Sequence, residues 1–386
     1  MYRFIIDKTV FTAFITFYAI FYVIPFSYIT FYNNKGFVNL YNYEFSILPL
    51  LIIALFPVLI LILDFTFPKS KLSRINIKQD LSSLFLFIFI LLLVSSVVFS
   101  INYGLDFRHD TSKTLSNSGP FATITFALKS VGRAFVLVIF FKFISGLKLN
   151  TIHKLSVLFI ILSYSITIVS ASDIFVIIPG ALVFFPNLTE VFTSKTNIQK
   201  SLFYLAIILI TVIAVIFVGN ANKIGIETAF ELFLSKESWG FIFENTIKRI
   251  STFYVSTFAN HDAWINNYFY SIEAIAGSLN NFTFRFFHLF GFDYSMNSEF
   301  WSINRLNYTL LFYDANHDVA GASPGIVATI YLFPIFPLGL LFMLGYSIFI
   351  LRSISSLLKN EMNRNLITVF ILFTFMLPFF ETPLVL

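Results

Sequence analysis

Arginines at five places in the chain could bind a phosphate-bearing substrate. A guanidinium is planar, keeps its charge at any physiological pH and donates two parallel hydrogen bonds to the oxygens of a phosphate or pyrophosphate. Salt bridges to nearby carboxylates are the alternative for each of them. The five are Arg108, Arg133, Arg249, Arg285 and Arg305.

Histidine is followed directly by aspartate three times in the chain: at His109, His261 and His317. Adjacent residues seldom both reach one metal ion, and no HxH or HExxH spacing is present, so no metal site is predicted. A neutral histidine can instead take a proton from a hydroxyl group. Ordinary loop polarity explains any single pair more simply. We select His317, with Asp318 as its alternative, because it lies just before the last large apolar segment.

Aromatic residues close to these groups could stack on sugar rings. The candidates are Trp264, Trp301 and Tyr313. An aromatic belt at a membrane surface is the alternative explanation for tryptophan and tyrosine in such positions.

The composition indicates a membrane protein that must hold these groups in a helical frame. Of 386 residues, 58% are hydrophobic and only 12% are charged, whereas a soluble domain carries about 25% charged residues. Runs of about 20 apolar residues predict spanning helices, so the fold class is all-α, a polytopic transmembrane bundle. The chain has no cysteine, which excludes disulfides and thiolate metal sites.

Nine spans are predicted, with ten or more possible if a helix is hidden in the long polar segment. Phe282–Phe292, rich in phenylalanine, is the best candidate for a re-entrant piece. The first span is too long for a signal-peptide core and lacks a cleavage site. The nine are Val10–Thr30, Phe45–Leu63, Leu81–Ile101, Phe121–Phe141, Leu155–Ser170, Ile174–Phe192, Ser201–Val218, Gly325–Leu351 and Leu366–Leu386.

Basic residues predict how the spans are oriented. Fourteen lie at loops and ends on one side, and the short loops of the other side hold only Lys35, Arg108 and Lys113. The positive-inside rule then places the N-terminus in the cytoplasm and the C-terminus outside. Since the excess positive charge of +5 lies mostly in short loops, no nucleic-acid partner is expected.

The predicted organisation has three parts: seven spans in 1–219, a large outer loop in 220–323, and the C-terminal spans in 324–386. The loop has a net charge near −4 and contains all three tryptophans. Apolar residues recur at three- to four-residue spacing from Phe243 to Phe258, which predicts an amphipathic helix on the membrane surface or packed onto the bundle.

Two basic residues lie inside the fourth span. Lys129 and Arg133 are one turn apart, and Arg133 is about 18 Å along the helix from its start. Lys129 could extend its side chain to the membrane surface. For Arg133 that is harder, so we predict that it lines a polar cavity.

The segment Gly321-Ala-Ser-Pro-Gly-Ile-Val-Ala-Thr-Ile-Tyr-Leu-Phe-Pro-Ile-Phe-Pro-Leu-Gly339 follows the long loop. Together with the frame rich in Phe, Leu and Ile and the late outer loop, it resembles the Wzy-type polymerases of O-antigen and capsule repeat units, which are related to the O-antigen ligases. An Arg-x15-Gly spacing of that family is matched by Arg305 and Gly321.

The resemblance implies a glycosyltransferase in the bacterial cytoplasmic (inner) membrane. Its substrates would be undecaprenyl-pyrophosphate-linked oligosaccharides, and its partners a chain-length-regulating co-polymerase and a flippase. His317 or Asp318 would activate the acceptor hydroxyl, and arginines, Arg305 first, would neutralise the departing pyrophosphate. No P-loop is present, and no cofactor or metal is expected. An O-antigen ligase-like transferase and a lipid-linked oligosaccharide flippase are the alternatives.

Overall fold

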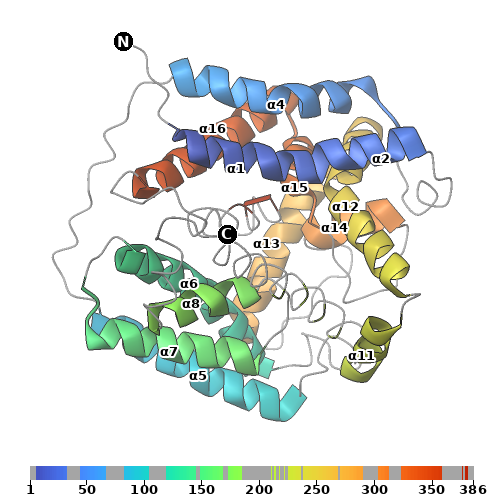
Figure 1. Ribbon diagram of the computed structural model, residues 1–386. Coiled ribbons are helices and arrows are strands. Elements are labelled where there is room, and N and C mark those ends of the chain that lie inside the picture. The colour runs from blue at the N-terminus through green and yellow to red at the C-terminus, as the bar shows by residue number, and fades with distance from the viewer. Residues whose placement is uncertain are drawn as a thin grey trace, which may run out of the picture.

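The computed structural model describes the chain in segments: 6–32, 44–66, 82–103, 119–144, 148–167, 173–184, 225–235, 238–267, 270–289, 303–312 and 323–358, with a few single residues. Every regular element in these segments is helical, as the composition predicts. Two groups of roughly side-by-side helices enclose a layer of further helices (Figure 1).

The first helix group contains the N-terminal helices, α4 and α16. The second helix group contains α5 to α8. The first group is α1 (Lys8–Tyr18), η1 (Ala19–Val23), α2 (Ile24–Tyr32), α4 (Ile47–Thr66) and α16 (Phe336–Leu358). The second is α5 (Ser82–Tyr103), α6 (Gly119–Ile144), α7 (Thr151–Ile166) and α8 (Ile174–Phe184).

The middle layer comes from the long segment before α16. The longest of its helices, α12, packs against the first group, and α13 packs against α6 of the second. The layer comprises α12 (Ser238–Asn266), α13 (Tyr270–Leu289), α14 (Ile303–Phe312), α15 (Gly325–Ala328) and η3 (Thr329–Leu332), while α11 (Ile226–Leu234) lies apart from both groups.

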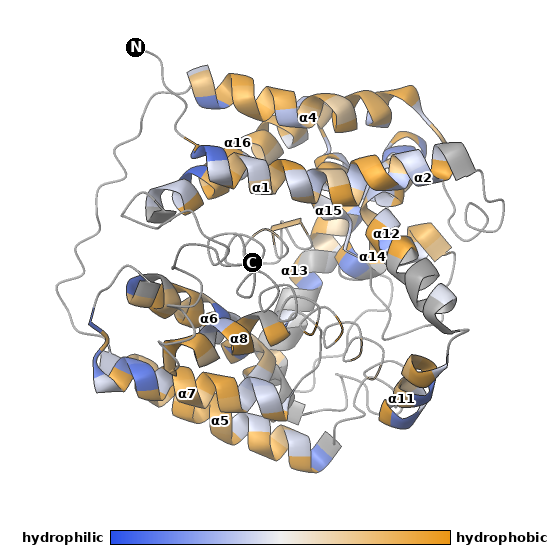
Figure 2. Ribbon diagram, in the orientation of Figure 1, coloured by the Kyte–Doolittle hydropathy of each residue, from blue (hydrophilic) through white to orange (hydrophobic). Residues whose placement is uncertain are grey.

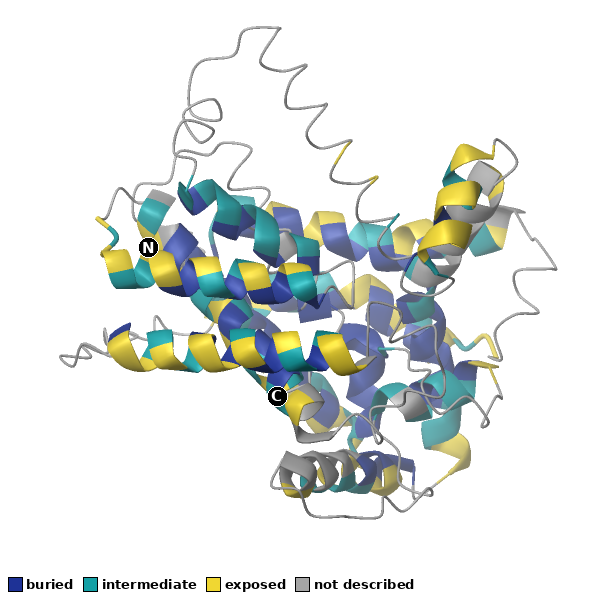
Figure 3. Cartoon of the chain, turned by 90° about the horizontal axis from the view of Figure 1, so that it is seen from below, coloured by how far each residue is buried: buried dark blue, intermediate teal, exposed yellow. Residues whose placement is uncertain are grey.

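Four of the described helices are long and apolar enough to cross a membrane. Their apolar character is visible along α4 and α5 (Figure 2). Side chains at Leu51, Leu55, Val58 and Ile62 of α4 follow a three- to four-residue spacing and are each about half exposed. Exposed faces of this kind alternate with buried ones along the helices (Figure 3). A continuous apolar face without protein cover indicates a membrane protein. The four stretches are Lys8–Thr30, Ile47–Thr66, Ser82–Asn102 and Phe336–Ser356.

Helices also occupy the fourth, fifth and sixth predicted spans, as α6, α7 and α8. Of these, α7 is an apolar helix that is shorter than a full span. The seventh and ninth predicted spans lie almost wholly outside the described residues. The count of nine spans, and the side on which 220–323 lies, therefore stay predictions.

The first span is one continuous helix with a wider turn in its middle. The π-helical turn η1, Ala19–Val23, comes just before Pro25. Proline has no N–H, and its ring clashes with the carbonyl four residues earlier, so a widened turn relieves both problems. The helix then continues as α2 and reaches the length needed for a span.

The predicted span Gly325–Leu351 is wrong at its start. Residues 325–332 form two short helical pieces that are almost fully buried, and the chain then breaks at Phe333, whose φ and ψ are −93° and 138°. The break occurs because Pro334 disfavours helical geometry at the residue before it. The long helix begins only at Phe336.

Two glycines let this short piece pack tightly. Gly325 has a φ of +81°, and a Cβ there would lie 2.8 Å from Cδ1 of Phe253 on α12. At Gly339 a Cβ would lie 2.3 Å from the carbonyl oxygen of Ile330. Only glycine permits both the left-handed backbone and these close approaches.

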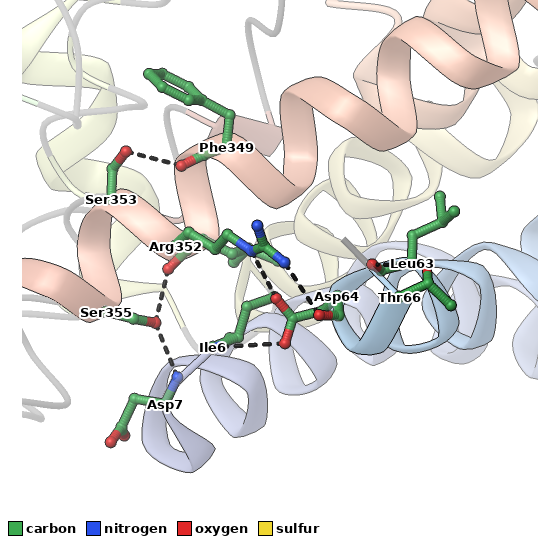
Figure 4. Close-up of polar contacts among 10 residues, drawn as sticks. Ile6, Asp7, Leu63, Asp64, Thr66, Phe349, Arg352, Ser353 and Ser355 are labelled. Atoms are coloured by element: carbon green, nitrogen blue, oxygen red, sulfur yellow. Dashed lines mark hydrogen bonds and ion pairs between the residues drawn. The ribbon is translucent and has the colours of Figure 1, made fainter. Parts of the chain in front are cut away.

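A buried ion pair closes one end of the first group (Figure 4). Asp64, at the end of α4, accepts hydrogen bonds from Arg352 Nε at 2.8 Å and from the backbone N–H of Ile6 at 3.2 Å. Arg352 Nη2 also donates to the Asp64 carbonyl at 3.0 Å. The start of α1 thus meets the late parts of α4 and α16, which agrees with the predicted alternation of the spans.

Candidate functional site

A second ion cluster lies inside the second helix group, whereas the pair of Asp64 and Arg352 lies near the helix ends of the first group. The Lys129 ammonium of α6 lies 2.8 Å from Oδ2 of Asp173 and donates to the carbonyl oxygen of Thr167 at 2.6 Å. It also stands over the ring of Tyr164 on α7, 4.5 Å from the centroid. Lys129 and Asp173 are 6% and 3% exposed. Lys129 therefore does not extend to the membrane surface but pairs inside the protein.

Arg133 shares the same carboxylate. Its Nη2 lies 3.7 Å from Oδ1 of Asp173, and its side chain is 29% exposed. One carboxylate thus contacts two basic side chains, one buried and one partly exposed. A carboxylate stabilises nearby positive charge most strongly where the surroundings are apolar. The exposed part of Arg133 is where an anionic group could approach.

The sequence did not single out Asp173. It lies in the short gap between the predicted spans Leu155–Ser170 and Ile174–Phe192, where an acidic residue looks like an ordinary loop residue. Its partner Lys129 is 44 residues away. A usable signal was present, because an isolated acidic residue at a span end can neutralise a lysine inside a neighbouring span.

Helix α12 is the amphipathic helix predicted around Phe243–Phe258, but it is not a surface helix. Its residues 251–260 are buried on nearly every side. One of its buried hydroxyl groups is satisfied within the helix, since Thr257 Oγ1 donates to the Phe253 carbonyl at 3.0 Å. The packing alternative is therefore the one that the structure shows.

Buried amides and hydroxyls join α12 to α13 and α14. Asn260 Nδ2 donates to Oδ1 of Asn307 at 2.7 Å, and Asn307 Nδ2 donates to Oγ of Ser256 at 3.0 Å. The Tyr270 hydroxyl donates to Oδ1 of Asn260. All four side chains are at most 2% exposed. Such a connected network fixes the relative positions of the three helices.

His261 lies beside this network. It is 5% exposed, and its ring meets the ring of Tyr331 edge to face, 5.1 Å between centroids. Burial lowers the pKa of His261, and the Asp262 carboxylate opposes that effect only in part. The imidazole is therefore neutral near pH 7, the form that accepts a proton. Within the described part of the chain, the buried Tyr331 hydroxyl has no hydrogen-bond partner.

Trp264 is the predicted sugar-stacking residue whose contacts are visible. Its ring packs 6.3 Å from Tyr331 and 6.1 Å from Phe336. It is partly exposed and, like His261, contacts Tyr331.

The other predicted site residues are less defined. Arg249, Arg285 and Arg305 lie on α12, α13 and α14, and only their backbone positions are described. The structure brings Arg133 together with Lys129 and Asp173, and both Trp264 and His261 contact Tyr331. Five predicted residues lie outside the described segments: Arg108, Trp301, Tyr313, His317 and Asp318.

No protein-family model, curated protein or solved structure matches this chain. The resemblance carried by Gly321–Gly339 therefore stays a prediction. Among the described residues, no group of three or more His, Asp or Glu side chains could hold a metal ion. The functional proposal therefore rests on two groups of residues. One is the ion cluster of Lys129, Arg133 and Asp173, and the other is the set of buried residues around His261.

Proposed function

We propose that this chain is a membrane glycosyltransferase that joins lipid-pyrophosphate-linked oligosaccharide units at the outer face of the bacterial cytoplasmic membrane. The acceptor hydroxyl of a new lipid-linked unit forms a bond to the anomeric carbon of the growing glycan. The bond from that carbon to undecaprenyl pyrophosphate breaks, and the lipid pyrophosphate leaves as an anion. The acceptor proton passes to a base on the protein.

The observation that carries this proposal is the partly exposed Arg133 in a helix of an apolar bundle. Arg133 lies beside the buried Lys129–Asp173 pair, and its partly exposed guanidinium can donate two parallel hydrogen bonds to the oxygens of a pyrophosphate. Stabilising the charge of the leaving group is usually the larger contribution to catalysis, with losses of about 10²–10³ in rate when one donor is removed.

On the acceptor side, we expect a histidine to act as the base. His317 is our predicted base, and the structure adds His261, a neutral histidine that, like the partly exposed Trp264, contacts Tyr331. A base typically contributes about 10²–10⁴ in rate. The two histidines are separable by substitution.

Purified protein in nanodiscs, supplied with a lipid-pyrophosphate repeat unit, should form a ladder of products without added nucleotide. Arg133→Gln should lower the rate by about 10² or more, whereas Lys142→Gln, at an exposed position on the same helix, should leave it unchanged. Arg305→Ala and His317→Ala should abolish the ladder with expression intact. Absence of a ladder from the unaltered protein, with intact lipid substrate recovered, rejects the transferase. A ladder that persists in Arg133→Gln rejects this site.

A flippase is the second candidate, favoured by the polar interior of the second helix group. Ser95, Thr125 and Lys129 are all buried there, and the Thr125 hydroxyl donates to Oγ of Ser95 at 3.0 Å. A transporter places polar groups inside its bundle in this way. Movement of the lipid-linked unit across proteoliposomes without chain growth would select the flippase. Transfer to a lipid A acceptor alone would select the ligase-like transferase.

A further inference from the structure

Helix α11 has three distinct faces. Ala229 is fully buried, with Leu232 and Phe233 partly buried near it, so this face contacts the protein. Ile226, Phe230 and Leu234 are 48%, 57% and 74% exposed. At 3.6 residues per turn, residues four apart share one side of a helix, so these three form a single apolar stripe.

The third face is acidic. Glu227 and Glu231 are exposed and lie on the far side of the apolar stripe from Ala229. Around the helix, the face that contacts the protein is therefore followed by the apolar stripe and then by the carboxylates. A helix surrounded by water does not need a second apolar face beyond the one that the protein covers.

The position of α11 identifies what covers the stripe. Phe217, in the apolar segment Ser201–Val218, meets Phe233 edge to face with 5.4 Å between ring centroids. Gly225, with a φ of +86°, then turns the chain into α11. The helix thus lies beside the end of an apolar segment long enough to span a membrane. It is also set apart from both helix groups (Figure 1).

We infer that α11 is an interfacial helix, which lies on the bilayer with Ile226, Phe230 and Leu234 among the lipid chains and Glu227 and Glu231 in water. The sequence of α11, IETAFELFL, contains no basic residue. Apolar burial alone must therefore hold it, without attraction to anionic headgroups. This inference rests on the membrane character of the protein and not on the proposed transferase activity.

The absence of cysteine makes a direct test possible. Phe230→Cys and Glu231→Cys, each labelled with an NBD fluorophore in phosphatidylcholine nanodiscs, compare neighbouring positions on two faces. Position 230 should show blue-shifted emission, strong quenching by lipids with nitroxide on the acyl chain, and loss of iodide quenching. Position 231 should show the reverse. Replacing part of the lipid by phosphatidylglycerol should change neither result.

Two outcomes overturn the inference. Equal iodide quenching at both positions places the stripe in water. Protection of position 230 from both quenchers shows that protein covers the stripe instead, either a partner or a second copy of the chain. Leu234→Cys, at the most exposed position of the stripe, repeats the comparison if Phe230→Cys fails to insert.

Discussion

The two helix groups each contain a buried aspartate paired with a basic residue, but they use it differently. Asp64 lies near the end of α4, pairs with Arg352 and accepts a further hydrogen bond from a backbone N–H. Asp173 faces two cations, Lys129 and Arg133, on a helix that runs through the second group. The side chains of the first pair, Arg352 and Asp64, are only 12% and 0% exposed. The second includes a partly exposed guanidinium, that of Arg133, which is why we place function there.

The largest loss of stability should come from the second group. Asp173→Ala leaves the buried Lys129 ammonium without its carboxylate, and removal of one partner of a buried pair costs about 3–5 kcal/mol. Thermal unfolding in detergent measures the loss. The double variant Lys129→Met, Asp173→Leu removes both charges and should unfold close to the unaltered protein. Equal losses in the single and double variants would contradict the account.

The ion pair of the first group should be less sensitive. Asp64→Asn keeps the shape but removes the charge that Arg352 faces, and the loss of a charged hydrogen bond costs about 1.5–3 kcal/mol. Asp7→Asn is the matched control, since asparagine caps a helix as well as aspartate does and Asp7 Oδ1 accepts the N–H of Thr9 at 2.8 Å. A larger effect at Asp64 than at Asp173 would reverse the comparison.

The middle layer should depend on its amide network. Asn260→Ala leaves buried groups of Asn307 and Tyr270 without a partner, and each such group costs about 1–3 kcal/mol. Asn266→Ala, on the same helix but exposed, provides the control. Protease resistance of the α12–α14 region, together with unfolding, reports the change. Similar behaviour of the two variants would mean that the network does not fix the layer.

Replacing each of two glycines by alanine should change the stability of the protein in opposite directions. Gly325→Ala forces a left-handed backbone on alanine and a contact with Phe253, which costs about 1–2 kcal/mol for the backbone alone. Gly240→Ala, on α12 with no heavy atom within 4 Å of the added Cβ, should stabilise the protein by about 0.5–1 kcal/mol. Denaturation of both variants in one detergent measures the two changes in stability. Destabilisation at both positions would contradict the predicted opposite signs.

The smallest expected effect concerns pH. Because burial lowers the pKa of His261 in the folded protein, the unfolded chain takes up the proton first as the pH falls. The stabilising contribution is therefore present above about pH 6.5 and is lost below it. His261→Gln should flatten the decline in unfolding temperature between neutral and mildly acid pH. An unchanged slope of unfolding temperature against pH would show that His261 does not cause the decline.

The sequence was sufficient to locate most helices but not to show which residues of different helices contact each other. Long apolar runs located α4 and α5 to within a few residues, because a span is a local property of composition. The start of α16 was misplaced, since the apolar run continues through Pro334 although the helix does not. Asp173 was missed because its role depends on a lysine in another helix. Likewise, periodicity located α12 but could not show that the bundle covers it on most sides.

The pair between Asp64 and Arg352 joins residues 288 positions apart in the chain. A ribosome adding about 5–20 residues per second needs about 15–60 s to make that stretch. During this interval α4 has entered the bilayer while its guanidinium partner does not yet exist. The carboxylate is close to the end of its helix, where headgroups and water can solvate it during the wait. Closure of this pair is thus a late step in biogenesis, and it joins the first-made helices to α16.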